Sequence, residues 1–383
     1  MRDNYIQTAE SVTEGHPDKL CDTIADRVLD ACLEHDSSAR VACEVMATAG
    51  KIIVAGEITA RQLPDIPAIV CRTVRETGYD SDYEVEVITH DQSGDIAGAV
   101  DSSAQLGAGD QGIMYGYACS ETEQLLPLPV VLAHRLTARL TSARVQSTIP
   151  GLGPDGKAQV SVEYRSNAPM RIAAVVVSCQ HDAGKDLYQL RHEITRHVIT
   201  PALQDFGLDS QTEILINPSG RFVLGGFEAD TGLTGRKLMV DTYGGLVPHG
   251  GGALSGKDAT KVDRSGTYMA RYIAKNIVAA GLAERCTVSL AYAIGRAEPV
   301  AVDVDTHNTS WCAEEALVRA VRSVFDLTPS GIIRTLGLDW PIFSRYCNYG
   351  HFTNQDAPWE QTDRAAALAE ACGCGHGRTH NEP

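Results

Sequence analysis

The stretch Gly232-Leu-Thr-Gly-Arg-Lys237, followed by His249-Gly-Gly-Gly-Ala-Leu-Ser-Gly-Lys257, decides how this sequence is interpreted. Both segments lie in a glycine-rich, basic region between Asn217 and Arg264. Glycines let backbone N–H groups approach an anion closely, and lysine and arginine side chains supply the compensating charge. Tight turns beside solvated cations are the alternative explanation. The density of both residue types favours a polyphosphate site, with ATP as the ligand that we expect.

Part of this region, Gly251 to Lys257, has the G-x-x-x-x-G-K spacing of a P-loop. The next residue is Asp258, so the Ser or Thr hydroxyl that would bind Mg²⁺ is absent. No apolar helical pattern follows this run directly. We therefore exclude a P-loop NTPase and expect a different way of holding the phosphates.

The composition predicts a globular cytoplasmic protein. A chain of 383 residues with 43% hydrophobic residues is long enough for two or three packed domains. A formal net charge of −16 argues against nucleic acid and anionic membranes as main partners. No apolar run has membrane-spanning length, the N-terminus carries no signal-peptide pattern, and the 11 cysteines show no paired metal-ligand spacing. A soft-metal site at Cys372, Cys374 and His376 is conceivable, but residues 371–383 are better explained as a flexible tail.

Hydrophobic periodicity and turn residues predict a mixed α/β (α+β) fold. Pairs of strands followed by a long helix recur about three times, which suggests a weak structural threefold repeat. Residues 92–112 are rich in Gly, Ala, Ser and Asp, and we interpret them as a mobile lid, with a plain linker as the alternative. We expect a helix starting near Pro17 and helices at 66–77, 187–206, 262–283, 313–325 and 330–337, and strands at 41–48, 51–59, 84–90, 158–164, 171–180, 213–217, 287–294 and 300–304.

Three aspartates lie near the glycine-rich or basic elements: Asp18, Asp230 and Asp263. Mg²⁺ prefers one or two carboxylates together with phosphate oxygens and water, so these are candidate metal ligands. Asp18 stands at an expected helix start, where a favourable interaction with the helix dipole explains it equally well. His16 at the same point is suited to stabilise charge on a leaving phosphate, with helix capping or packing as the alternative.

Glu44 and Glu57 lie on opposite arms of the hairpin that we expect at 41–59. Both could be ordinary solvent-facing charges. Glu57 stands among small apolar residues, in Ala55-Gly-Glu-Ile58, which suits a carboxylate that pairs with the ammonium group of a substrate.

Several long motifs resemble S-adenosylmethionine synthetase (methionine adenosyltransferase). They occur in the family's order and extend to about Leu368. The motifs are Glu10-Ser-Val-Thr-Glu-Gly-His-Pro-Asp-Lys19, Gly107-Ala-Gly-Asp-Gln-Gly112, Gly232-Leu-Thr-Gly-Arg-Lys237, His249-Gly-Gly-Gly-Ala253, Ser255-Gly-Lys-Asp258, Lys261-Val-Asp-Arg-Ser265, Tyr349-Gly-His-Phe352 and Trp359-Glu360.

The resemblance implies that methionine sulfur attacks C5′ of ATP and expels tripolyphosphate, which is then hydrolysed to diphosphate and phosphate. It implies ATP and L-methionine as substrates, and two Mg²⁺ ions per site and K⁺ as cofactors. By motif, the catalytic positions are His16, Lys157, Arg236 and Lys257. The ATP-binding positions are these four with Asp155, Arg221, Phe222, Asp230, Lys237 and Ala253; the methionine positions are Glu57, Gln92, Asp230 and Lys261; the metal ligands are Asp18 and Asp263 for Mg²⁺ and Glu44 for K⁺.

The family's fold consists of three similar α/β domains in a pseudo-threefold arrangement, formed from non-consecutive segments. It assembles as homodimers or homotetramers with active sites at the dimer interface. On this basis we expect an N-terminal domain of residues 1–12 and 121–225, a central domain of 13–92 and 226–262, a C-terminal domain of 100–120 and 263–370, and a mobile gate at 93–110.

Departures from the family pattern leave a second function open. Two of them replace an arginine, and all lie near the expected site: Ser93-Gly-Asp95 for Ser-Pro-Asp, Gly225-Gly-Phe-Glu-Ala-Asp230 for Gly-Gly-Pro-Met-Gly-Asp, Pro248 for arginine and Gly153 for arginine. A specialised paralogue that adenosylates a methionine analogue is one alternative. A non-catalytic ATP-binding regulatory subunit is another, which the presence of His16, Lys157 and Lys257 disfavours.

Overall fold

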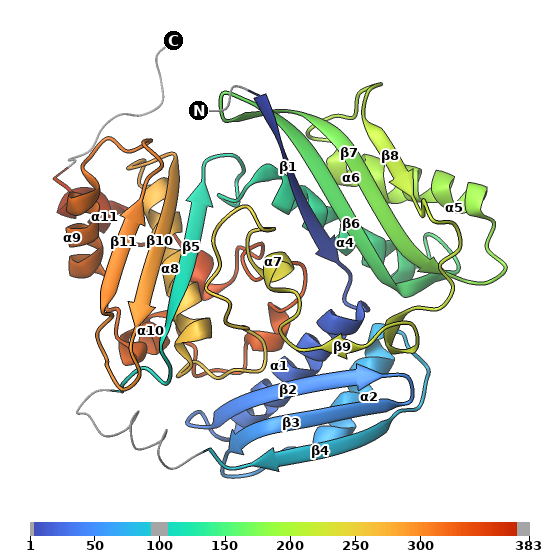
Figure 1. Cartoon of the computed structure of the whole chain (residues 1–383), viewed down its shortest axis with the longest axis horizontal. Helices are drawn as coiled ribbons and strands as arrows, with labels where there is room; N and C mark the ends of the chain where they lie inside the picture. The colour runs from blue at the N-terminus through green and yellow to red at the C-terminus, as the bar shows by residue number, and fades with distance from the viewer. Residues whose placement is uncertain (1–3, 93–105, 374–383) are drawn as a thin grey trace.

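The computed structural model describes residues 4–92 and 106–373 of the chain. Most of the expected gate at 93–110 and the tail residues Cys374 and His376 lie outside these described residues. The described chain forms three β-sheets, each with one long helix packed against it, as Figure 1 shows. This mixed α/β architecture confirms the predicted fold class.

The first sheet has the order β1 (Asn4–Val12), β6 (Leu152–Arg165), β7 (Ala168–His181) and β8 (Glu213–Ile216). Helix α4 (Leu128–Val145) packs against β1 and β6. The second sheet has the order β11 (Ala301–Asp305), β10 (Arg285–Tyr292) and β5 (Gly112–Cys119), and helix α8 (Val262–Ala279) packs against β5 and β10. Helices α9 (Glu314–Val324), α10 (Pro329–Leu336) and α11 (Ala365–Ala371) complete this part of the molecule.

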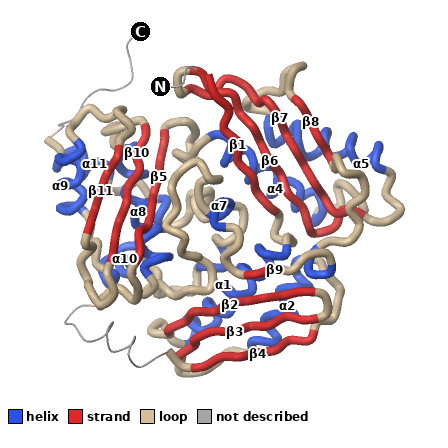
Figure 2. Tube along the Cα trace, in the orientation of Figure 1, coloured by secondary structure: helices blue, strands red, loops and turns tan. Residues whose placement is uncertain are grey.

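The third sheet has the order β4 (Glu84–His90), β3 (Lys51–Thr59), β2 (Arg40–Thr48) and the short β9 (Gly232–Leu233). Helix α1 (Pro17–His35) packs against β2 and β9, and α2 (Ile66–Thr77) lies beside α1. The short α7 (Leu238–Asp241) lies between the sheets. Figure 2 shows that every sheet combines segments far apart in the sequence, because β1 joins β6, β5 joins β10, and β9 joins β2.

Buried apolar side chains form two cores. One fills the space beneath the second and third sheets together, and the other lies between the first sheet and its helices. None of the helices in the described part of the chain has the length and apolarity needed to cross a membrane.

The predicted helix at 187–206 is interrupted. It consists of α5 (Leu187–Ile194), a π-helical turn (Thr195–Ile199) and α6 (Thr200–Leu203). Pro201 has no N–H group to donate to the carbonyl of His197, four residues earlier, and its ring crowds that turn. The freed His197 carbonyl accepts a hydrogen bond from Arg139 Nε at 3.2 Å, so a side chain replaces the missing backbone donor.

His134 on α4 is buried and neutral. Its Nδ1 lies 2.8 Å from Ser11 Oγ, and Ser11 Oγ also lies 2.8 Å from Thr137 Oγ1. Burial lowers the pKa of His134 to about 3, with a further contribution from the positive charge of Lys19. An unfolded chain would protonate this ring near pH 6.5, so at acidic pH the unfolded state binds the extra proton.

We therefore expect stability to fall as the pH drops from 6.5 towards 3, and His134→Asn to weaken this dependence. Asparagine preserves an acceptor near the Nδ1 position but does not titrate. At pH 5 the wild-type histidine costs about 2 kcal/mol of unfolding free energy relative to pH 7. Urea unfolding of both proteins at pH 7 and pH 5 measures the difference, and an unchanged pH dependence in the variant would refute the assignment.

Candidate polyphosphate site

Helix α1 begins at the residues predicted to contact phosphate. Pro17 occupies the first turn, where a missing N–H costs little, and His16 is the N-cap. His16 Nδ1 accepts the backbone N–H of Asp18 at 3.2 Å, so the capping role and the proposed functional role fall on one ring. Because Nδ1 accepts, the proton of the neutral ring is on Nε2, which is a donor.

Burial, together with the charges of the nearby cations Lys237 and Lys157, lowers the pKa of His16 to about 3. His16 is therefore a neutral hydrogen-bond donor at neutral pH. The same cations show where positive charge gathers, because both lie close enough to act on this ring.

The first glycine-rich loop, residues 232–237, joins the start of α1. Asp18 Oδ1 accepts the backbone N–H of Leu233 at 3.0 Å, and Asp18 Oδ2 lies 2.5 Å from Lys237 Nζ. Arg236 NH1 lies 3.6 Å from the same carboxylate, and half of its side chain is exposed. Burial raises the pKa of Asp18, but the Lys237 and Leu233 hydrogen bonds outweigh it and hold the pKa below its usual value.

The second glycine-rich loop, residues 249–261, meets β2 at residues 256–258 and leads into α8, which carries Asp263. Gly256 accepts the backbone N–H of Cys43 at 2.9 Å, and Lys257 forms a bridge with Ala42. Lys257 Nζ pairs with Asp263 Oδ2 at 2.7 Å, with both side chains about one-fifth exposed. A side chain at Gly252 would come within 2.2 Å of the Asp263 carboxylate, so glycine is required there.

The two loops touch and share one strand. Leu233 pairs with Met46 on β2, and Lys257 bridges Ala42, four residues away on the same strand. At about 3.3 Å per residue, these points lie roughly 13 Å apart. Gly235 in the first loop lies against Ala253 in the second, where a side chain would come within 2.7 Å.

Asp155 and Lys157 lie on β6, near the segment that precedes the first loop and near His16. Asp155 Oδ2 accepts the backbone N–H of Gly226 at 3.0 Å, and burial raises the pKa of Asp155 to about 6. Asp230 is exposed, and its charge acts on Asp155. Gly153, which replaces an arginine of the family pattern, lies against Gln180, so a side chain there would displace that glutamine.

Arg221 and Phe222 follow β8, at the same edge of the first sheet as Asp155. Arg221 NH2 donates to the Ala183 carbonyl at 2.8 Å, and the Phe222 backbone N–H lies 3.1 Å from His181 Nε2. Both residues are held by loop contacts, and the guanidinium of Arg221 is exposed.

Glu44 and Glu57 lie on the open face of the third sheet. Register places Glu44 opposite Ala55 and Glu57 opposite Ala42, so both carboxylates point to the same side. Glu57 Oε1 lies 3.4 Å from His90 Nε2. Gln92, at the edge of the described residues, donates its backbone N–H to Thr59 Oγ1 at 3.0 Å.

Lys261 pairs with Asp258 rather than facing the open sheet surface. Asp258 is buried and also accepts the backbone N–H of Val41 at 2.7 Å. Lys261, which the sequence assigned to methionine, is therefore occupied in this structure by an ion pair with Asp258. The same aspartate anchors the second loop to β2.

Within residues 4–92 and 106–373, no three His, Cys, Asp or Glu side chains converge as a protein-only metal site. Asp18 and Asp263 are instead single carboxylates, each beside a lysine. Such a donor set fits Mg²⁺ that takes one carboxylate and completes its shell with phosphate oxygens and water.

Sequence reasoning identified only Asp18 on α1 and missed Asp22, Asp26 and Asp30. All three are buried, and each accepts backbone N–H groups from a distant loop. Their four-residue spacing in a helix that is otherwise largely apolar was the available signal, because such spacing places side chains on one face.

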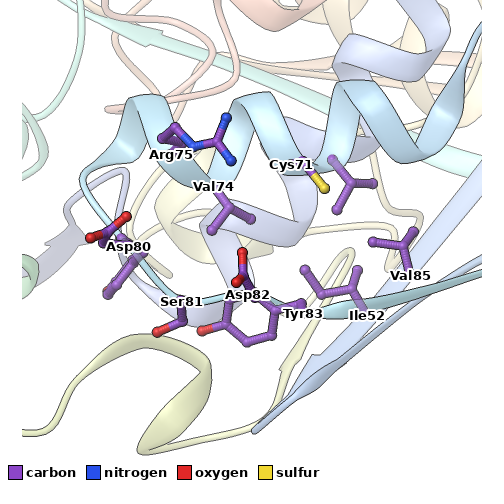
Figure 3. A pocket seen from close by; sticks show the side chains of 11 residues that line it. Ile52, Cys71, Val74, Arg75, Asp80, Ser81, Asp82, Tyr83 and Val85 are labelled. Carbon is purple, nitrogen blue, oxygen red and sulfur yellow. The ribbon is translucent and has the colours of Figure 1, made fainter.

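Two hollows elsewhere lack the predicted site residues. The cavity in Figure 3 lies between α2 and the start of β4, near Cys71, Val74 and Tyr83, and holds about 50 Å³. That volume is far below the ~300–1,000 Å³ of small-molecule pockets. A more open hollow at the end of α1 is lined by His35, Arg61 and Trp340 among others.

Comparison with protein-family models gives three matches in chain order. They are the S-adenosylmethionine synthetase N-terminal domain over residues 4–100, the central domain over 105–222 and the C-terminal domain over 224–361. The models divide the chain consecutively, whereas the hydrogen-bonded sheets join non-consecutive segments. Together the three matches span the loops, the start of α1 and the β6 residues described above. The chain therefore belongs to the S-adenosylmethionine synthetase family.

Proposed function

We propose that this protein is a methionine adenosyltransferase that uses ATP and L-methionine. The observation that carries the proposal is the pair of cationic loops, Arg236–Lys237 and Lys257, held on one strand beside His16. Each loop lysine is paired with a carboxylate suited to a magnesium ion, Asp18 or Asp263. This arrangement suits a long, highly charged phosphate chain.

In the proposed reaction a lone pair of the methionine sulfur forms a bond to C5′ of ATP, and the C5′–O bond breaks with its electrons on oxygen. The products are a sulfonium and tripolyphosphate, and the sulfur has no proton to lose. A general base is therefore unnecessary, and the site must supply positioning and stabilisation of the leaving group. Water then cleaves the bound tripolyphosphate to diphosphate and phosphate.

His16 is suited to the oxygen that leaves C5′. Its Nε2–H is a neutral donor, so it adds a hydrogen bond where negative charge develops. Lys157, Arg236, Lys237 and Lys257 neutralise the remaining phosphate charge. Asp155, Arg221, Phe222, Asp230 and Ala253 are proposed to complete the ATP site.

Two Mg²⁺ ions bound by Asp18 and Asp263 would neutralise phosphate oxygens, and K⁺ near Glu44 would complete the cofactor set. Lys237 and Lys257 now hold these aspartates, so each lysine would exchange its carboxylate for a phosphate when metal and ATP bind. Glu57, Gln92, Asp230 and Lys261 are the proposed methionine contacts. Lys261 reaches methionine only by leaving Asp258.

A homodimer with the sites at its interface is part of the proposal, with pairing of dimers into a tetramer left to measurement. All three sheets expose large apolar side chains: Ile6 on β1, Ile113 on β5, and Met46 and Ile88 on β2 and β4. A dimer interface would cover side chains of this kind. The described cysteines from Cys21 to Cys347 are all free thiols, which supports a reduced, cytoplasmic location.

Purified wild-type protein incubated with ATP, methionine, Mg²⁺ and K⁺ should yield S-adenosylmethionine, diphosphate and phosphate in equal amounts by mass spectrometry and phosphate assay. Sedimentation of the same preparation should show a dimer or tetramer. Omitting Mg²⁺ is the control and should abolish product. ATP binding without triphosphate release would instead identify a regulatory subunit, and a clear preference for another thioether in competition would identify a paralogue.

A further inference from the structure

Four aspartates form one row along α1: Asp18, Asp22, Asp26 and Asp30. Each lies one turn after the last, and all four are buried. Like charges at this spacing repel each other, and burial removes the water that would screen them. The row therefore persists only because each carboxylate has specific partners.

Among the described residues, Asp22 has two partners, and one of them, Gly235, lies in the first glycine-rich loop (residues 232–237). Asp22 Oδ1 accepts the backbone N–H of Gly235 at 2.8 Å, and Asp22 Oδ2 lies 3.1 Å from Lys19 Nζ. Lys19 Nζ also lies 2.7 Å from Oδ1 of Asp241, the last residue of α7. Arg236 and Lys237 lie between Gly235 and α7, so the buried triad holds the chain on both sides of them.

The geometry at Gly235 leaves the loop little freedom to move. Its φ is +76°, a conformation that favours glycine, and it lies against Ala253 of the second loop. Asp26 supports that second loop in the same way. Its Oδ1 accepts the backbone N–H of Gly256, next to Lys257, and its carboxylate also binds the buried Arg264.

We propose that Asp22, together with Lys19 and Asp241, is a positioning unit that aligns Arg236 and Lys237 for the phosphate chain. This inference rests on the proposed function, since the aligned cations are assigned to ATP and tripolyphosphate. Asp22 is fully buried, so it acts through the loop backbone and contacts no substrate. Its effect is on geometry, and a misplacement of 1 Å is enough to cost about 100-fold in rate.

Asp30 is a matched control on the same helix face. It is also buried, and it accepts the backbone N–H groups of Phe343 at 2.9 Å and Ser344 at 2.8 Å. These two residues belong to a segment with no proposed phosphate contact. Loss of Asp30 therefore removes hydrogen bonds from a buried carboxylate to loop backbone N–H groups, as loss of Asp22 does, but away from the two glycine-rich loops.

The test compares Asp22→Ala, Asp22→Asn and Asp30→Ala in the full chain. Alanine at 22 removes the acceptor for Gly235 but leaves Lys19 paired with Asp241, so no buried charge is stranded. Asparagine keeps an acceptor. We measure binding of Mg²⁺–tripolyphosphate by calorimetry, kcat, the KM values for ATP and methionine, and the thermal unfolding temperature.

Asp22→Ala should weaken tripolyphosphate binding and lower kcat/KM for ATP by about 10- to 100-fold, with the KM for methionine unchanged. Asp22→Asn should recover part of the loss. Asp30→Ala should lower the unfolding temperature and leave tripolyphosphate binding unchanged.

Wild-type affinity in Asp22→Ala, or equal losses in Asp22→Ala and Asp30→Ala, would overturn the positioning role. If Asp22→Ala does not accumulate as folded protein, Asp22→Asn is compared with Asp30→Asn, and equal affinities overturn it. Failure of the wild-type protein to bind tripolyphosphate or form S-adenosylmethionine would refute the proposed function instead.

Discussion

Replacing Lys257 by alanine is expected to lower kcat for S-adenosylmethionine formation by about 100- to 1,000-fold, the range seen when one donor to a developing anion is removed. The Lys257 ammonium is the cation of the second loop, and its partner Asp263 is assigned to Mg²⁺. Because this ion pair is partly exposed, its loss should cost no more than about 1 kcal/mol of stability. Steady-state kinetics and thermal unfolding separate the two effects.

Lys51→Ala is the matched control for this substitution. Lys51 is a partly exposed lysine at the start of β3, and it pairs with Glu84 and Glu86 at the opposite end of the strand from Glu57. Its removal should leave kcat unchanged. A near-normal rate in Lys257→Ala would mean that the phosphates bind elsewhere.

Glu360→Ala should lower the free energy of unfolding by about 3–5 kcal/mol, the cost of breaking a buried ion pair from one side. The Glu360 carboxylate accepts Arg271 Nε at 2.8 Å and NH2 at 2.7 Å, and Lys275 Nζ at 2.7 Å. All three side chains are buried, so alanine leaves two cations on α8 without their carboxylate. Urea unfolding followed by circular dichroism measures the loss.

Glu76→Ala provides the comparison for an exposed pair. Glu76 binds Arg27 at 2.5 Å, but both side chains are substantially exposed, so its loss should cost less than about 1 kcal/mol. A loss of similar size in both variants would show that the α8 cations find other partners or water.

Local patterns predicted strands β2, β3 and β4 of the third sheet, but not the short β9. The strands at 51–59 and 84–90 and the helix at 66–77 have the predicted bounds, and the strand at 41–48 begins one residue earlier. Short-range signals are strong here, because Gly50 forms the hairpin turn with φ +74° and Gly78 ends α2 in the left-handed conformation.

Elements that depend on distant partners were not predicted. Strand β5 contains Gly116, which packs against the backbone of Ala270 on α8, and no neighbouring residue indicates that contact. Helix α4 is buried over most of its surface, so it lacks the one-sided apolar pattern that identifies a helix. Helix α8 ends at Ala279, four residues before the predicted end.

The residues of the candidate site also fall into those that the sequence indicated and those that only the structure revealed. Motif and charge indicated the loop cations and Asp18, because glycine density and basic residues are visible in a linear sequence. Asp22 resembles an ordinary helix-surface charge until Gly235 is placed against it, more than 200 residues later. The individual roles of the site residues stay predictions until the variants are measured.

The pairing of β5 with β10 also constrains how the chain is made. About 165 residues separate the end of β5 from the start of β10. At ribosomal rates of about 5–20 residues per second, β5 waits roughly 10 to 30 s for its partner. Strand β1 likewise precedes β6 by about 140 residues. Nascent chains therefore carry unpaired strand edges for most of their synthesis, and such edges are prone to pair with other chains and aggregate.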